Sequence, residues 1–101
     1  MPEPFWIQLT EDSTSEMNAL RAFDRTKVVQ AMFTHLTHEP TKVSRSRIKK
    51  MDQPFWSQYR LRIEDFRVYY DVDEDTRRVT ILRILKKGTE ETAKESSYEA
   101  N

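Results

Sequence analysis

Apolar and polar residues alternate over three successive short runs between Gln58 and Leu85. Alternation with a period of two is typical of strands that bury one face, so three such runs joined by short turns predict an antiparallel meander. The predicted apolar positions of the first two strands are Tyr59, Leu61, Ile63, Phe66, Val68, Tyr70 and Val72. The third strand, from Val79 to Leu85, is apolar on both faces and is therefore expected in the interior of the sheet.

A two-residue turn at residues 64–65 would set the register of the first two strands. It places Arg62 opposite Arg67 and Arg60 opposite Tyr69, on the face away from the apolar positions. Like charges that face each other across a ladder destabilise a sheet by roughly 0.2–1 kcal/mol, and an anion is the simplest partner that would offset this cost. The alternative is that the arginines are solvated and that their aliphatic stems cover the sheet.

The segment before the meander predicts one strand and two helices. Residues 5–9 alternate and predict an N-terminal strand. Ser13 followed by Glu16 has the spacing of a capping box, which predicts a short helix from near Ser13 to Asp24. Asp24 would cap a second helix that Pro40 ends. The apolar positions of this second helix are expected at Val28, Val29, Met32, Phe33 and Leu36.

These elements predict an α+β fold with a four-stranded, mostly antiparallel sheet and an α-helical hairpin on one face. A chain of 101 residues is expected to form one domain, with a core at about residues 5–88 and a tail at 89–101 that is weakly ordered or a short helix. The sequence lacks cysteine, which excludes disulfides and thiolate zinc sites. It also lacks a signal peptide and a long apolar run, so the expected location is the cytoplasm, with no membrane contact.

Charge is distributed unevenly along the chain, although 17 basic residues balance 17 acidic residues. Residues 42–62 carry seven basic residues and one acidic residue, whereas residues 1–16 and 90–101 are acidic. Within the basic segment, Arg47, Lys49 and Lys50 are predicted to lie beside the arginines of the sheet, or else to form a solvated linker. The middle of the chain is therefore the candidate site for an anionic partner.

Familiar catalytic signatures are missing from the sequence, including Gly-rich phosphate loops, nucleophile elbows and His-Glu zinc motifs. His35 and His38 have a spacing that suits a metal, but no third ligand is evident, so no metal and no cofactor are expected. Arginines on a sheet face can bind adjacent phosphates and stabilise the charge that develops during phosphoryl transfer. Tyr69 could stack on a base or donate to a phosphate.

The runs YRLR, FRVYYDVD and VTILRILKK, in this order after two helices and a basic loop, resemble the RelE/ParE superfamily of type II toxin-antitoxin toxins over about residues 5–88. RelE-type members cleave mRNA on the ribosome, and ParE-type members poison DNA gyrase. The resemblance implies metal-free RNA cleavage, in which the ribose 2′-hydroxyl attacks the neighbouring phosphate. It also implies three partners, namely a cognate antitoxin protein, the ribosome and mRNA.

The resemblance carries over to four residues, which it implies are catalytic: Arg60, Arg62, Arg67 and Lys87. The RNA-binding residues expected with them are Arg47, Lys49, Lys50, Tyr69 and Lys86. No general base is assigned, because arginine keeps its proton at physiological pH. The position of the RelE catalytic tyrosine is occupied by Ala93, Tyr98 matches it only loosely, and Leu85 replaces a glycine usual in the family.

Three hypotheses follow in order of preference. The first is an mRNA endoribonuclease that inhibits translation, and the second is a ParE-like inhibitor of DNA gyrase. The third is a catalytically weak or inactive protein-binding module on the same fold. In both toxin cases an acidic or amphipathic antitoxin segment should wrap the helical hairpin and the sheet.

Overall fold

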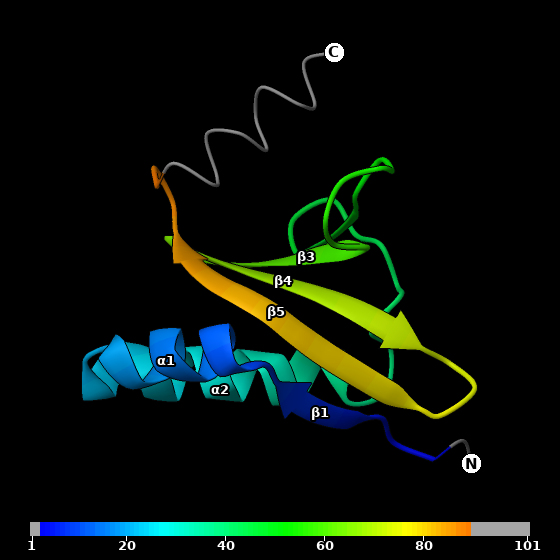
Figure 1. The fold of residues 1–101 in the computed structure, drawn as a ribbon, viewed down its shortest axis with the longest axis horizontal. Coiled ribbons are helices and arrows are strands. Elements are labelled where there is room, and N and C mark those ends of the chain that lie inside the picture. Colours follow the sequence, from blue (N-terminus) through cyan, green and yellow to red (C-terminus); the bar gives the residue numbers. More distant parts are fainter. Residues whose placement is uncertain (1–2, 90–101) are drawn as a thin grey trace.

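The computed structural model describes residues 3–89, in which two helices cover one face of a five-stranded sheet (Figure 1). The elements in chain order are β1 (Trp6–Leu9), α1 (Glu11–Ala19), α2 (Ala22–Leu36), β2 (Ile48–Lys50), β3 (Tyr59–Ile63), β4 (Phe66–Asp73) and β5 (Arg78–Lys86). The α+β class, the N-terminal strand, the helical hairpin and the meander are confirmed. The prediction for the tail concerns residues 89–101, and all of these after residue 89 lie outside the described residues. No helix within residues 3–89 is long and apolar enough to cross a membrane.

The strand order is β1-β5-β4-β3-β2, with β1 parallel to β5 and the other neighbours antiparallel. The sheet has one strand more than the four that were predicted. This additional strand, β2, lies in the segment that was expected to be a loop. Its three residues, Ile48–Lys50, are too few to show alternation, and they become a strand only by pairing with β3. The predicted β3–β4 register is confirmed, with a tight turn in which Glu64 adopts a left-handed φ of 51°.

A register shift in the β4–β5 ladder explains why the third predicted strand is apolar on both faces. Tyr69 pairs with Arg83, whereas Tyr70 pairs with Ile81, so β5 carries one extra residue at this point. Such a bulge changes the phase of the strand, which lets both Ile81 and Ile84 face the core. β4 lies in the middle of the sheet and is buried on both faces from Phe66 to Tyr70, which corrects the prediction that it would have one solvated face.

Both helices begin at residues other than those predicted. α1 starts at Glu11, and its N-cap is Thr10, whose hydroxyl accepts a bond from the Ser13 N–H while the Ser13 hydroxyl accepts from the Thr10 N–H. Ser13 therefore occupies the third helical position of the capping box, where Glu or Gln is more usual. α1 ends at Ala19, and α2 begins at Ala22 with Arg21 as N-cap, so the predicted cap at Asp24 is wrong.

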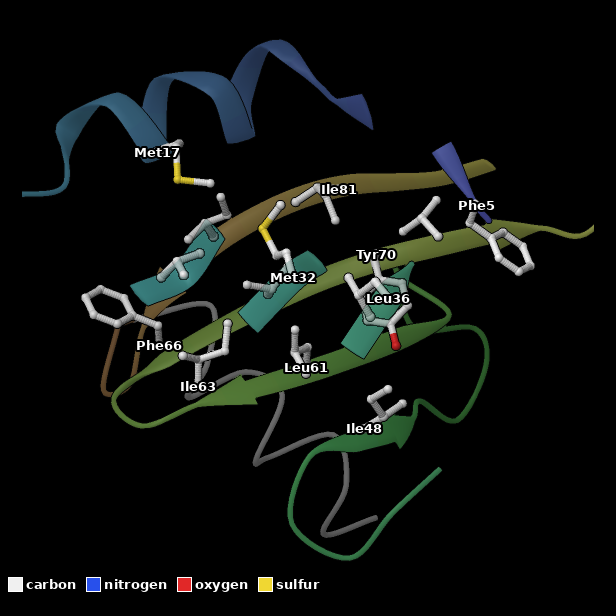
Figure 2. Close-up of a cluster of buried hydrophobic side chains, with 14 residues drawn as sticks. Phe5, Met17, Met32, Leu36, Ile48, Leu61, Ile63, Phe66, Tyr70 and Ile81 are labelled. Atoms are coloured by element: carbon white, nitrogen blue, oxygen red, sulfur yellow. The ribbon is translucent and has the colours of Figure 1, made fainter. Parts of the chain in front are cut away.

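The main core lies between the helices and the sheet (Figure 2). Its buried residues are Phe5, Met17, Val28, Met32, Leu36, Ile48, Leu61, Ile63, Phe66, Val68, Tyr70, Val79, Ile81 and Ile84. Phe33 was predicted to belong to the apolar stripe of α2, but it is 59% exposed. The buried Tyr70 hydroxyl donates to the Pro40 carbonyl at 2.6 Å and so attaches the segment after α2 to the sheet.

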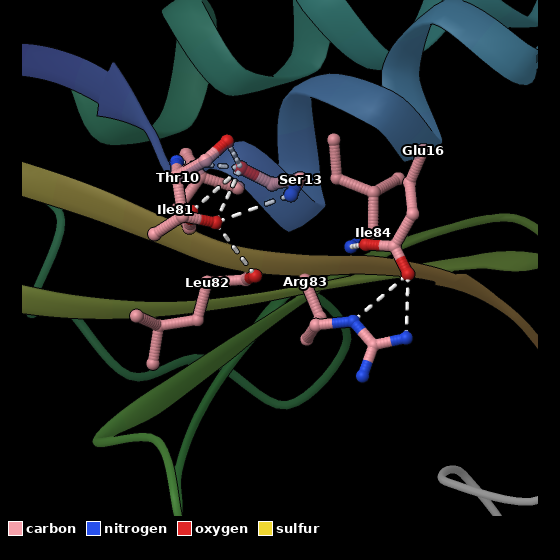
Figure 3. A network of polar contacts seen from close by, with 7 residues as sticks. All are labelled: Thr10, Ser13, Glu16, Ile81, Leu82, Arg83 and Ile84. Atoms are coloured by element: carbon pink, nitrogen blue, oxygen red, sulfur yellow. Dashed lines mark hydrogen bonds and ion pairs between the residues drawn. The ribbon is translucent and has the colours of Figure 1, made fainter.

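Helix α1 also protects the edge of β5 beyond the end of β1 (Figure 3). The Thr10 N–H and the Ser13 hydroxyl donate to the Ile81 carbonyl at 3.1 and 2.7 Å. Glu16, one turn further along α1, accepts a bond from the Ile84 N–H at 2.8 Å. Since an open strand edge can pair with other chains, these side chains take the place that a longer β1 would have filled.

Candidate nucleic-acid interface

Cations and one tyrosine form a row across the sheet, on the face opposite the helices. The ladders pair Lys49 with Arg60, Arg60 with Tyr69, and Tyr69 with Arg83, so one residue from each of β2, β3, β4 and β5 contributes to the row. The Arg83 guanidinium is ion-paired at 2.6 Å with Glu16 of α1, so the cations at the β2 end of the row are the candidates for an anionic ligand (Figure 3). Neighbours in a row share a face because side chains of paired residues point to the same side. The next positions of β3 and β4, Arg62 and Arg67, lie directly opposite each other, as predicted.

The loop before β2 adds a further arginine to this face. The Arg47 guanidinium donates to the Arg62 carbonyl at 3.3 Å, and the Arg47 carbonyl accepts from the Arg62 N–H at 2.9 Å. Residues 43–49 line a small cavity of about 110 Å³ together with Arg60 and Arg62. We call Arg47, Lys49, Arg60 and Arg62 the basic face. The prediction that part of the basic loop joins the sheet arginines is therefore confirmed for Arg47 and Lys49.

Arg67 lies in the same ladder as Arg62 but has a different environment. Its side chain is buried, with the whole residue 7% exposed. Its guanidinium donates to the Glu64 carbonyl at 2.7 Å and to the Phe66 carbonyl at 2.9 Å, so it braces the β3–β4 turn. Both bonds come from one nitrogen, Nη1, which donates its two protons to carbonyls on either side of the turn. The structure thus gives Arg67 a structural task, and its catalytic role stays a prediction.

Tyr69 was predicted to stack on a base, but its side chain is fully buried. It belongs to a second, smaller core with Met51, Phe55 and Leu85, which the loop between β2 and β3 closes from outside. The ring of Trp56 covers it with a centroid distance of 4.6 Å. The prediction is wrong because alternation alone cannot show that a distant loop folds back over a strand.

Three predicted lysines lie apart from the basic face. Lys50 pairs with Tyr59 and so shares the helix-covered face, and Lys86 pairs with Phe66, whose side chain lies in the main core. Lys87 follows β5, and its N–H donates to the carbonyl of Asp65 in the β3–β4 turn at 2.6 Å. Consecutive residues of a strand point to opposite faces, so the adjacent pair Lys49 and Lys50 could not both join one patch.

His35 lies near the end of α2 and is half-buried. Partial burial, and then the positive charge of Arg47, lower the pKa of His35 below its ordinary value. Within residues 3–89, no group of three or more His, Cys, Asp or Glu side chains is arranged to hold a metal ion.

Comparison with known families identifies the chain. The family described as the ParE toxin of the type II toxin-antitoxin system parDE matches residues 7–90. The chain belongs to this ParE toxin family. No curated protein sequence matches it. The family assignment confirms the resemblance to the RelE/ParE superfamily.

Several solved structures with a similar fold are of RelE toxins or of RelE–RelB complexes. The Mycobacterium tuberculosis RelBE2 toxin-antitoxin complex gives a TM-score of 0.72 at 23% identity, over 83% of this chain and 99% of the other. The RelE–RelB complex of Pyrococcus horikoshii gives a TM-score of 0.68 at 19% identity, over 83% of this chain and 96% of the other. A double mutant of Escherichia coli RelE in the free state gives a TM-score of 0.67 at 14% identity, over 97% of this chain and 99% of the other. At these identities, the likeness shows that this ParE-family chain has a RelE-like fold.

Proposed function

We propose that this ParE-family toxin is a ribosome-dependent endoribonuclease that cleaves mRNA, inhibits translation and acts in the cytoplasm. The observation that supports this proposal is the basic face, where Arg47, Lys49, Arg60 and Arg62 converge on the side of the sheet opposite the helices. Guanidinium groups bind phosphates with two parallel hydrogen bonds, and several neighbouring cations match the closely spaced phosphates of an RNA strand. Neither a cofactor nor a metal enters this proposal.

Cleavage would proceed by attack of the ribose 2′-oxygen on the adjacent phosphorus. The new O–P bond forms as the bond to the 5′-oxygen breaks, which leaves a 2′,3′-cyclic phosphate on one product and a 5′-hydroxyl on the other. Arg60 and Arg62 would stabilise the negative charge that develops on the nonbridging oxygens. The 2′-hydroxyl proton must pass to a base that is not an arginine, because arginine keeps its proton at physiological pH. The departing 5′-oxygen would take up a proton from water, which completes the 5′-hydroxyl product.

The test compares two faces of the same sheet in cells. Wild type, the double variant Arg60→Ala with Arg62→Ala, and the control Lys50→Ala on the helix-covered face are each expressed from a tight inducible promoter. Transcript 5′ ends are mapped by primer extension alongside growth. Wild type and the control should arrest growth and produce new 5′ ends within translated codons, and the double variant should do neither. New 5′ ends that persist in the double variant would contradict the proposal.

Inhibition of DNA gyrase is the second candidate function. It is favoured by the family match, since the matching family is named for ParE toxins. The same experiment separates the two candidates, because a gyrase inhibitor would arrest growth with intact transcripts and induce the response to DNA damage. A well-folded protein that causes no arrest would instead support a binding module without catalytic activity.

We also propose that a cognate antitoxin is the protein partner, as two of the similar structures are toxin-antitoxin complexes. An apolar groove of about 750 Å³ between the N-terminal segment and α2 is lined by Phe5, Trp6, Ile7 and Phe33. Trp6 and Phe33 are 76% and 59% exposed. Exposed apolar surface of this kind marks protein-protein contact sites. Replacing both residues by serine should therefore weaken copurification with the antitoxin and leave toxicity intact.

A further inference from the structure

We propose that Trp56 is a stacking platform for an unpaired base of the RNA strand that the basic face holds. This inference rests on the proposed function, which it extends from the phosphates of the ligand to its bases. The family resemblance assigns no role to Trp56, and Tyr69, the aromatic residue first expected to stack, is buried beneath it.

Trp56 combines partial exposure with close aromatic support. Its ring lies 4.7 Å from the Phe55 ring, nearly parallel at 30°, and 4.6 Å from the Tyr69 ring. Phe55 and Tyr69 are 7% and 0% exposed, whereas Trp56 remains 41% exposed. A residue that served only to cover the small core would gain by burying more of its apolar surface, because apolar surface left in water does not stabilise the fold. Trp56 is therefore the exposed member of this aromatic cluster.

The loop that carries Trp56 is held in place on both sides. The Met51 N–H donates to the Gln58 carbonyl at 2.9 Å, which continues the pairing of β2 with β3 beyond Lys50. The buried Ser57 hydroxyl donates to the Tyr59 carbonyl at 3.2 Å, and the Gln53 amide donates to the Ser57 carbonyl at 3.1 Å. Because the loop is already ordered before binding, the free energy of binding is not reduced by the entropy cost of ordering the loop.

Trp56 also lies beside the cations that would hold the phosphates. It covers Tyr69 on β4, and Tyr69 pairs with Arg60 on β3, which in turn pairs with Lys49 on β2. Adjacent strands are about 4.8 Å apart, so Arg60 lies one strand spacing from the residue under the indole and Lys49 lies two. Stacking and phosphate binding are the two recurring elements of single-strand recognition.

The second tryptophan provides a matched control. Trp6 is on β1, at the opposite edge of the sheet from β2, and is more exposed than Trp56. Since the chain contains only these two tryptophans, Trp6→Phe leaves Trp56 as the sole indole emitter without altering the candidate platform. Conversely, Trp56→Phe leaves Trp6 as the sole emitter.

The experiment titrates both variants with a mixed-sequence single-stranded oligonucleotide whose 2′-O-methyl groups block cleavage. Tryptophan fluorescence reports contact with the indole, and the anisotropy of a dye on the oligonucleotide reports binding. The Trp6→Phe protein should show quenching of Trp56 as the oligonucleotide binds, and the Trp56→Phe protein should show no quenching. An oligonucleotide with abasic sites should bind without quenching. Because a stacked base contributes ~1–3 kcal/mol, Trp56→Ala should weaken binding roughly 5- to 150-fold.

The outcomes separate this inference from the proposed function. Binding that requires Arg60 and Arg62, but neither quenches Trp56 nor weakens in Trp56→Ala, would overturn the platform and leave the RNA-binding face intact. Absence of oligonucleotide binding by the wild-type protein at low salt would overturn the platform, whereas the proposed function is decided separately by the 5′-end mapping in cells. Thermal unfolding of each variant establishes that it is folded, and the Trp6→Phe measurement leaves the loop unchanged, so a folding defect in Trp56→Ala cannot decide the result.

Discussion

The two faces of β3 show how one stretch of sequence serves two purposes. Leu61 and Ile63 point to the helices and are buried in the main core, whereas Arg60 and Arg62 alternate with them on the opposite side. Burial of apolar surface is the main favourable term in folding, so the helix-covered face carries most of the stability. The basic face gains little from burial and instead gathers like charges, an arrangement that is costly in the absence of an anionic partner.

The comparison also shows that the face opposite the helices is itself divided. Near β2 it is basic, with Arg47 and Arg62 exposed and Lys49 and Arg60 half-buried, but over β4 it is closed by the loop between β2 and β3. Arg67 and Tyr69 lie under or beside this closure and are buried despite their polar groups. Position in the sheet, rather than residue type, therefore decides which cations and aromatics remain available to a ligand.

The largest effect on stability is expected at Leu61, and the adjacent residue of β3, Arg62, provides the comparison. Leu61→Ala removes a fully buried side chain and should lower the free energy of unfolding by ~2–5 kcal/mol. Arg62→Ala removes an exposed side chain that faces Arg67 and should change it by less than about 0.5 kcal/mol. Urea denaturation followed by circular dichroism measures both. Equal costs for the two variants would refute the division of labour between the faces.

A smaller loss is expected when Arg67 is replaced by alanine. The Glu64 and Phe66 carbonyls would then lose a guanidinium donor, and an unsatisfied buried polar group costs ~1–3 kcal/mol. The same denaturation assay serves here, with Arg62→Ala as the control for loss of an arginine from this face. If Arg67→Ala were as harmless as Arg62→Ala, the guanidinium would not brace the turn.

Ser13→Ala should cost ~1 kcal/mol, because the Ser13 hydroxyl caps α1 and also bonds to the Ile81 carbonyl. Ser15→Ala, at an exposed position of the same helix, is the matched control and should be neutral or slightly stabilising because alanine favours helices. The thermal midpoints of the two variants check this prediction. A smaller loss for Ser13→Ala than for Ser15→Ala would mean that α1 does not depend on its contact with β5.

The smallest effect concerns pH. The pKa of His35 is lowered in the folded protein, so between that value and the unfolded value of about 6.5 the unfolded chain binds more protons. Stability should therefore be constant above about pH 6.5 and decrease as the pH falls through this window. His35→Gln should flatten this decrease in a series of thermal midpoints from pH 8 to 5. Superimposable profiles for wild type and variant would contradict a shifted His35.

The elements that the sequence predicted well are those with local causes. The β3–β4 hairpin was predicted to the residue, since the turn at residues 64–65 and the alternation on either side lie within a few positions of one another. The helical hairpin was predicted from the spacing of apolar residues in the same way, but the first residues of its two helices were predicted incorrectly. Thr10 and Ser13 form the same pair of capping bonds as a Ser-Glu pair would, and both hydroxyls also donate to carbonyls of β5, so the cap of α1 is tied to a strand far away in the sequence.

The tertiary structure alone decided what happens between distant segments. Pairing with β3 made a strand of Ile48–Lys50, and in doing so sent Lys49 to the basic face and Lys50 to the other side. The return of the loop between β2 and β3 buried Tyr69 and left Trp56 exposed above it. Alternation along a strand specifies which residues share a face, because it is a property of the backbone. Whether that face is covered depends on packing against residues far away in the chain, and no local pattern encodes it.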